Sequence, residues 1–141
     1  MKPLHFILGL ALAGCTTANK PTPSASISEE KTREVLQHHL DAFLANDLEA
    51  TMADYTEESI LMTPDSTFTG LDQIRGNFMG AFAVLPKDST TLTIRMSVVS
   101  QDMAYIIWEA KAPKLSISFG TDTFIIQDGK IIRQTFAGVF N

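Results

Sequence analysis

Cysteine is almost absent from this chain, since Cys15 is the only one among 141 residues. One cysteine cannot form a disulfide within the chain, and three histidines offer no spacing typical of a structural zinc site. Positive charge is also scarce, with 11 Lys and Arg against 16 Asp and Glu, a formal net charge of -5 and no basic cluster. We therefore expect no metal site and no nucleic acid partner.

Several sequence motifs are missing as well. The chain has no phosphate-binding glycine-rich loop, no Gly-x-Ser-x-Gly elbow and no His-Glu-x-x-His pair. These absences argue against nucleotide, esterase and metalloprotease chemistry, and we expect no cofactor. What the chain does have is 45% hydrophobic and 19% charged residues, a balance typical of one globular domain.

The N-terminus is typical of an export signal. Lys2 precedes an apolar run over residues 4–12, interrupted only by His5 and Gly9, which is too short to span a bilayer permanently. We assign residues 1–14 as a signal peptide. The run ends in Leu12-Ala13-Gly14-Cys15. This sequence resembles the lipobox of bacterial lipoproteins, in which the cysteine is diacylated and the peptide is cut just before it.

The lipobox resemblance implies a place in the cell. Acyl chains contribute about 0.8 kcal/mol per buried methylene, so two or three of them hold a protein on a bilayer stably. Thr16, in place of an Asp after the cysteine, implies the outer membrane. We therefore expect a bacterial envelope protein, anchored by lipid on Cys15 and facing the periplasm. Residues 15–28 contain Pro21 and Pro23 with no apolar period and are interpreted as a flexible tether.

Helical periodicity dominates residues 28–86. Ser28 is a candidate N-cap, and the apolar positions from Val35 to Phe43 share one face, which places His39 inward and His38 outward. Asn46-Asp47 should break this helix, and a short second helix should follow. A strand over residues 59–63 ends at Pro64. A third helix should then run from Gly70 to just before Pro86.

The remaining residues alternate with a period of two. We predict four strands, over residues 91–98, 103–112, 115–126 and 131–140, with the last two joined by a tight turn at Asp128-Gly129. Short connections favour an antiparallel meander. The predicted fold is α+β, with three N-terminal helices packed on a curved antiparallel sheet. Such a sheet forms a cone with a mouth at one end, where pockets form.

Four local phrases carry a family resemblance: residues 39–43 with 47–48, residues 55–58, residues 70–74, and residues 121–124 leading into 128–131. They resemble the SnoaL-like branch of the nuclear transport factor 2-like superfamily, which also contains ketosteroid isomerase and scytalone dehydratase. The resemblance covers residues 28–141 and implies the cone fold over residues 29–141. It says little about activity, because this superfamily contains isomerases, dehydratases, cyclases and carriers.

Catalytic positions of the family transfer only in part. The resemblance places the general-base Asp of ketosteroid isomerase at Thr63, which cannot act as a base, and its oxyanion-binding Tyr at His39. The protonated, hydrogen-bond-donating Asp of the isomerase falls on Asp122. In polyketide-cyclase members an inward Asp acts as the acid or base, and Asp122 is similar to that residue. The resemblance thus argues against the isomerase reaction itself and for a polar spot in the same pocket.

Strand phase also places Asp122 among apolar groups, next to Gly120 and Phe124. A buried carboxylate needs a partner or a proton, so we hypothesise that His39 pairs with Asp122 across the pocket. The alternative is an Asp122 that faces solvent and a His39 that is bonded to a backbone carbonyl in the core. Other predicted pocket residues are Phe43, Tyr55, Thr63, Asp65, Phe78, Trp108 and Phe124. Of these, Tyr55 and Trp108 also fit plain core roles, and Asp65 is the other candidate base.

Three functions fit these observations. The first is a binding module that holds a small hydrophobic molecule. The second is a cofactor-independent isomerase, dehydratase or cyclase in which His39 and Asp122 transfer a proton. The third is a homodimeric interaction module that associates through the open sheet face.

Overall fold

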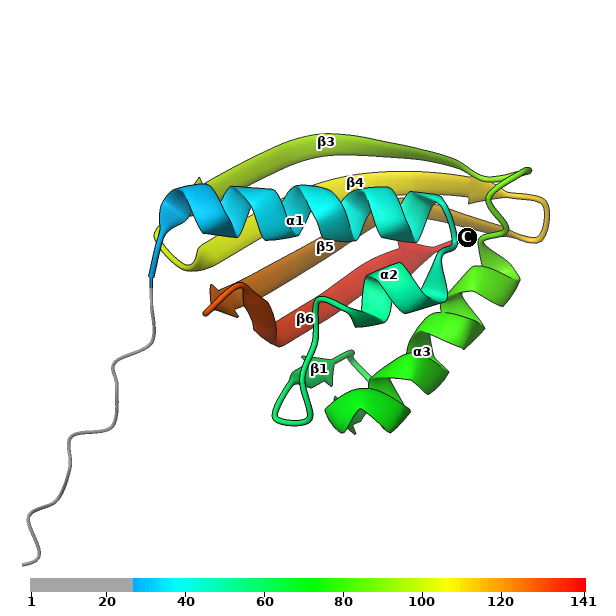
Figure 1. Cartoon of the computed structure of the whole chain (residues 1–141). Coiled ribbons are helices and arrows are strands. Elements are labelled where there is room, and N and C mark those ends of the chain that lie inside the picture. The colour runs from blue at the N-terminus through cyan, green and yellow to red at the C-terminus, as the bar shows by residue number, and fades with distance from the viewer. Residues whose placement is uncertain (1–26) are drawn as a thin grey trace, which may run out of the picture.

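The computed structural model describes residues 27–141 as three helices and six strands (Figure 1). The predicted signal peptide, Cys15 and all but the last two residues of the tether lie outside the described residues. The elements follow the chain as α1 (Glu29–Leu44), α2 (Leu48–Met52), β1 (Ile60–Met62), β2 (Thr67–Thr69), α3 (Gly70–Val84), β3 (Thr91–Ser100), β4 (Met103–Ala112), β5 (Leu115–Gln127) and β6 (Lys130–Phe140).

Capping and turn residues explain where the elements begin and end. The Ser28 hydroxyl accepts a hydrogen bond from the Lys31 backbone N–H at 3.3 Å, as expected for the N-cap of α1. Asn46 ends that helix region with a φ of 50°. Between β5 and β6, Asp128 and Gly129 both have positive φ, which is the geometry of the tight hairpin turn that the sequence predicted.

The six strands form one sheet in the order β2-β1-β6-β5-β4-β3. Strands β3 to β6 form the predicted curved antiparallel meander. Strand β1 runs parallel to β6, which the sequence did not predict, so the sheet as a whole is mixed. No hairpin joins β1 to β6, because α3 and four strands separate them along the chain. Their relative direction is therefore not fixed by a turn. Strand β2 was not predicted, since three residues are too few to show alternation.

A β-bulge changes which side chains of β3 face the core. Ile94 pairs with Trp108 and Met96 pairs with Ile107, so Arg95 is the extra residue. Continuous alternation had placed Met96 and Val98 on the same face as Ile94. The bulge moves Met96 and Val98 to the outer face of the sheet, where both are exposed.

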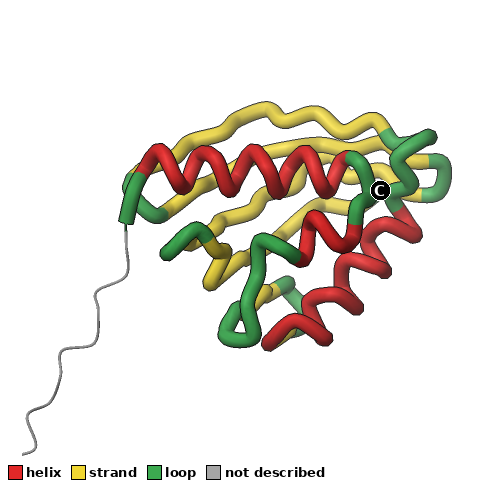
Figure 2. Tube along the Cα trace, in the orientation of Figure 1, coloured by secondary structure: helices red, strands yellow, loops and turns green. Residues whose placement is uncertain are grey.

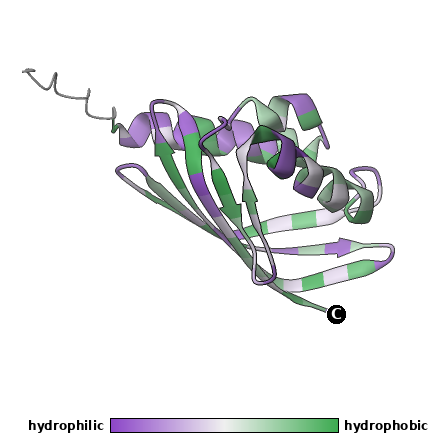
Figure 3. Ribbon diagram, turned by 90° about the horizontal axis from the view of Figure 1, so that it is seen from below, coloured by the Kyte–Doolittle hydropathy of each residue, from purple (hydrophilic) through white to green (hydrophobic). Residues whose placement is uncertain are grey.

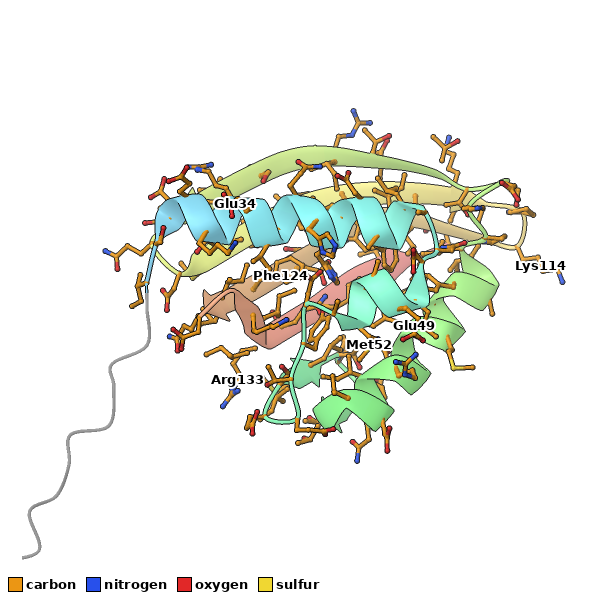
Figure 4. The ribbon with its side chains drawn as sticks, in the orientation of Figure 1. Glu34, Glu49, Met52, Lys114, Phe124 and Arg133 are labelled. Carbon is orange, nitrogen blue, oxygen red and sulfur yellow. The ribbon has the colours of Figure 1, made fainter. Side chains whose placement is uncertain are left out.

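The helices lie together on the concave side of the curved sheet (Figures 2 and 3). In Figure 4, the Phe124 side chain lies between α1 and the sheet, in the core, while Lys114 projects from the β4–β5 turn. Within residues 27–141, no helix is both long and apolar enough to cross a membrane. The helices and the inner face of the sheet leave a space between them, and this space is the candidate functional site.

Candidate functional site

A cavity of about 840 Å³ opens between the helices and the inner face of the sheet. The C-terminal half of α1 borders it from His39 to Leu44, α3 forms the wall facing the sheet, and the β1–β2 hairpin closes one side. Most of its surface is apolar. The sheet contributes the side chains Leu92, Ile94, Ile106, Trp108, Ile117, Asp122, Phe124, Gln134 and Phe136.

Asp122 is the acidic centre of a small polar cluster in this cavity. Its side chain is 6% exposed, and each carboxylate oxygen accepts one hydrogen bond. The Trp108 indole Nε1–H donates to Oδ2 at 2.7 Å, and the Gln134 amide donates to Oδ1 at 2.8 Å. The Tyr55 hydroxyl in turn donates to the Gln134 amide oxygen. Trp108 of β4 and Gln134 of β6 therefore hold the carboxyl group in place. Tyr55, in the loop after α2, holds the Gln134 amide.

Gly120 makes room for the indole that contacts Asp122. Gly120 lies opposite Trp108 in the β4–β5 register. A Cβ atom at Gly120 would lie 2.6 Å from Trp108 Cε2, closer than real Cβ contacts allow. The indole can therefore lie flat over this glycine, and it stacks against Phe136 with ring centroids 5.8 Å apart.

Burial controls the ionisation of this cluster. Desolvation raises the pKa of Asp122 above its ordinary value, and the hydrogen bonds from Gln134 and Trp108 and the nearby His39 offset only part of that rise. The pKa of Tyr55 lies well above its ordinary value, first because of burial and then because of the negative charges of Asp122 and Asp54. Tyr55 therefore keeps its proton and acts as a donor.

His39 lines the same cavity but has a different neighbour from the one predicted. Its ring is 3% exposed, and Nδ1 lies 3.4 Å from Asp54 Oδ2 without forming a well-aligned hydrogen bond. The other oxygen of Asp54 lies 2.8 Å from Nδ1 of His38, whose ring is half exposed. Within residues 27–141 no hydrogen bond joins His39 to Asp122, although His39 lies near enough to lower the pKa of Asp122. The imidazole faces Asp54, and Trp108 and Gln134 donate to the Asp122 carboxyl group.

The aromatic surroundings of His39 explain its orientation. The rings of Tyr55, Phe78 and Phe124 surround it, with centroids 5.4 to 5.7 Å away and steep interplanar angles. These edge contacts fix the imidazole between Asp54 and the cavity. Because Nδ1 faces Asp54, Nε2 is the ring nitrogen that points away from that carboxylate.

Most of the predicted pocket residues do border the cavity. Phe43, Thr63, Phe78, Trp108 and Phe124 all line it together with His39 and Asp122.

Tyr55 and Asp65 do not. Tyr55 is buried behind the cavity wall and reaches the cluster only through Gln134. Asp65 is exposed at the tip of a turn that the hydrogen bond from Thr63 N–H to the Ser66 carbonyl closes. Asp65 is not among the residues that line the cavity.

Two polar residues of the site were missed from the sequence. Gln134 was overlooked because strict alternation from Ile131 points Arg133 and not Gln134 inward. The structure has a bulge at Ile132, where the pairing passes from Ile126–Ile131 to Ile125–Arg133 and the phase reverses. Asp54 lies in the loop after α2, where no period applies, and no sequence signal singled it out. Within residues 27–141, no group of three or more His, Cys, Asp or Glu side chains could hold a metal ion.

Fold and site together define a cone-shaped α+β protein with an apolar cavity and an acidic polar cluster inside it. The SnoaL-like domain family matches residues 36–134, and the chain belongs to that family. The family resemblance inferred from the local phrases is confirmed. No curated protein matches the sequence.

Solved structures with the same fold are distant in sequence. A nuclear transport factor 2-like protein of unknown function from Mesorhizobium loti is 22% identical, with a TM-score of 0.67 over 79% of this chain and 93% of that one. A protein from Kribbella flavida provisionally named a ketosteroid isomerase is 16% identical, with a TM-score of 0.65 over 78% of each chain. One from Sinorhizobium meliloti, provisionally named a polyketide cyclase, is 19% identical, with a TM-score of 0.63 over 77% and 98%. These likenesses establish the fold.

Proposed function

We propose that this protein binds a small hydrophobic molecule in the cone cavity, with a polar group of that molecule at Asp122. The observation that carries the proposal is an apolar cavity of about 840 Å³ with one buried carboxyl group in its wall. Ligand pockets typically measure about 300–1,000 Å³ and combine apolar walls with a few oriented polar groups. The names of two structural neighbours, an isomerase and a cyclase, agree with a cavity that holds a small molecule.

The state of Asp122 selects the polar group of the ligand. Both oxygens already accept one hydrogen bond from the protein, so the remaining capacity of the carboxyl group is available to a ligand. The raised pKa of Asp122 keeps its protonated form present at higher pH than for an exposed Asp. A protonated carboxyl group donates a hydrogen bond, which favours a ligand carbonyl or hydroxyl oxygen.

Trp108 provides the test, because it is the only tryptophan in the chain and it borders the cavity. Titration of residues 27–141 with Nile red should change Trp108 fluorescence and give saturable dye emission. Ala81→Phe adds a ring on the cavity side of α3 and should weaken binding. Ala83→Phe adds the same ring at an exposed position of α3 outside the cavity and is the matched control. Equal dye affinity in both variants, or no saturable binding, would refute the proposal.

A second candidate function is proton transfer on a bound substrate. The position of His39 favours it, because three aromatic rings hold the imidazole between the Asp54 carboxylate and the cavity and its Nε2 can take a proton. Asp122 would stabilise the developing enolate oxygen as a hydrogen-bond donor. Thr63 borders the cavity but its hydroxyl is no base, so His39 would carry that role.

Deuterium exchange distinguishes an enzyme from a binding protein. A ketone with acidic C–H groups, such as β-tetralone, should lose α-deuterium to water faster with the protein than with buffer. His39→Gln should abolish the acceleration while Nile red still binds. Exchange at the buffer rate with the wild-type protein would exclude proton transfer on this probe class and leave the binding function.

The outer face of the sheet favours self-association as a further property. Met96, Val98, Met103, Phe119 and Val139 are each more than 40% exposed. The described helices lie on the opposite, concave side of the sheet (Figure 3). Exposed apolar side chains on one face of a sheet can mark an interaction site. We propose a homodimer through this face, which native mass spectrometry would detect and which Phe119→Lys should dissociate. A monomer at all concentrations would exclude it.

Attachment to the envelope completes the proposal. We propose that lipid on Cys15 anchors the mature protein to the bacterial outer membrane, on the basis of the lipobox resemblance at residues 12–15. Metabolic labelling with an alkyne fatty acid should mark the wild-type chain and not Cys15→Ser. Equal labelling of both chains would contradict the anchor.

A further inference from the structure

Two glycines lie in the middle of α3. Gly76 and Gly80 lie four residues apart in a helix that runs from Gly70 to Val84. Glycine in a helix interior is less stable than alanine because it loses more backbone freedom on folding. Neither residue has the positive φ that would require glycine, since the only described glycines with positive φ are Gly70 and Gly129. The backbone conformation therefore does not explain them.

Packing within the chain does not explain them either. A Cβ atom at Gly76 or Gly80 would meet no atom within 4 Å, whereas one at Gly120 would collide with the Trp108 ring. Alanine would fit at both α3 positions in the protein as it stands. Neither the backbone conformation nor packing within residues 27–141 therefore requires glycine at these two positions.

The cavity lies on that side of α3. Gly76 and Gly80 both border it, and so does Asn77 between them. The Asn77 amide is half-buried and makes no side-chain hydrogen bond within residues 27–141. The main contacts of α3 are with α2, β1 and β2 and not with the inner strands of the sheet, so its bare face looks across the open cavity. The same cavity is lined by the buried His39, whose Nδ1 faces Asp54.

We propose that Gly76 and Gly80 determine the width of the ligand, because their missing side chains let the ligand pack directly against the α3 backbone while the Asn77 amide hydrogen-bonds to it. This inference rests on the proposed binding function. It assigns the ligand a second polar group, away from the one at Asp122. Glycine makes α3 less stable than alanine would at these two positions. The space left by the missing side chains is part of the binding cavity.

Variants that should raise thermal stability but weaken ligand binding test the inference. Gly76→Ala and Gly80→Ala should each raise the melting temperature by about 2–5 °C, because alanine favours helix and meets open space. The same variants should weaken Nile red binding, by about threefold or more. Gly80→Leu fills more space and should weaken it by about tenfold or more. Met79→Leu, on the exposed side of α3 outside the cavity, is the matched control and should bind as the wild type does.

The outcomes separate this inference from the proposed function. Absence of dye binding to the wild-type protein would overturn both. Binding by the wild type with unchanged affinity in the Gly76 and Gly80 variants would overturn the inference alone. Unchanged dye affinity with an altered oligomer size in native mass spectra would assign the glycines to a protein contact and also overturn it. If the leucine variant fails to fold, the alanine variants still decide.

Discussion

Replacing Asp122 by Ala tests whether the polar cluster is buried as the structure describes. The change removes the acceptor of two hydrogen bonds, from Trp108 Nε1–H and from the Gln134 amide. Leaving a buried donor unpaired costs about 1–3 kcal/mol. Water that enters from the cavity side can satisfy part of this loss, so we expect the free energy of unfolding to fall by about 2–4 kcal/mol in total.

A second substitution at the same position separates hydrogen bonding from packing. Asp122→Asn keeps the shape and one acceptor oxygen but presents an NH₂ group to the other donor. Only one hydrogen bond is lost, so the expected loss is about 1–2 kcal/mol. Thr123→Ala, at the next position of β5 and facing the outer side of the sheet, is the control and should cost less than about 1 kcal/mol.

Urea unfolding followed by Trp108 fluorescence and by circular dichroism measures these differences, because the chain has no other tryptophan. Agreement of the two signals would establish a two-state transition and justify the comparison. A loss below about 1 kcal/mol for Asp122→Ala would mean that both donors are already hydrated. That result would refute the description of Asp122 as the buried acceptor of two hydrogen bonds.

Three further predictions concern stability. Gly120→Ala should destabilise the protein by about 1–3 kcal/mol and shift Trp108 emission, because the added Cβ collides with the indole. Asn46→Ala should cost about 2–3 kcal/mol in urea unfolding, because three side-chain hydrogen bonds and a left-handed backbone conformation depend on Asn46. The raised pKa of Asp122 means that the unfolded chain ionises first as the pH rises. The stability contributed by this group is therefore full below about pH 4 and is lost as the pH rises through the folded-state pKa, so wild type should weaken relative to Asp122→Asn over that interval.

The inward position of Asp122 was predictable from the sequence because β5 keeps its alternation from Gly120 to Ile126. The alternation placed the carboxyl group in phase with Phe124 and Ile126, and the structure has it buried. The boundaries of the helices were predictable for a similar reason, since Ser28, Asn46 and Gly70 are each required by a local conformation.

The partners of the buried groups were not predictable in the same way. Gln134 faces the cavity only because one extra residue in β6 reverses the phase, and a bulge leaves no clear pattern in a single sequence. Asp54 reaches His39 from a loop, where the side-chain direction depends on tertiary packing. Pairing between β1 and β6 joins segments about 70 residues apart, and no local signal encodes it.

The ends of α1 have practical consequences for handling the protein. Only the C-terminal half of this helix borders the cavity, and a helix of 16 residues is about 24 Å long. A fusion partner, purification tag or solid support joined before Ser28 is therefore held well away from the opening. Phe140, one residue from the other terminus, itself borders the cavity. Any attachment there would crowd the entrance, so immobilised formats for screening compounds should use the N-terminal side.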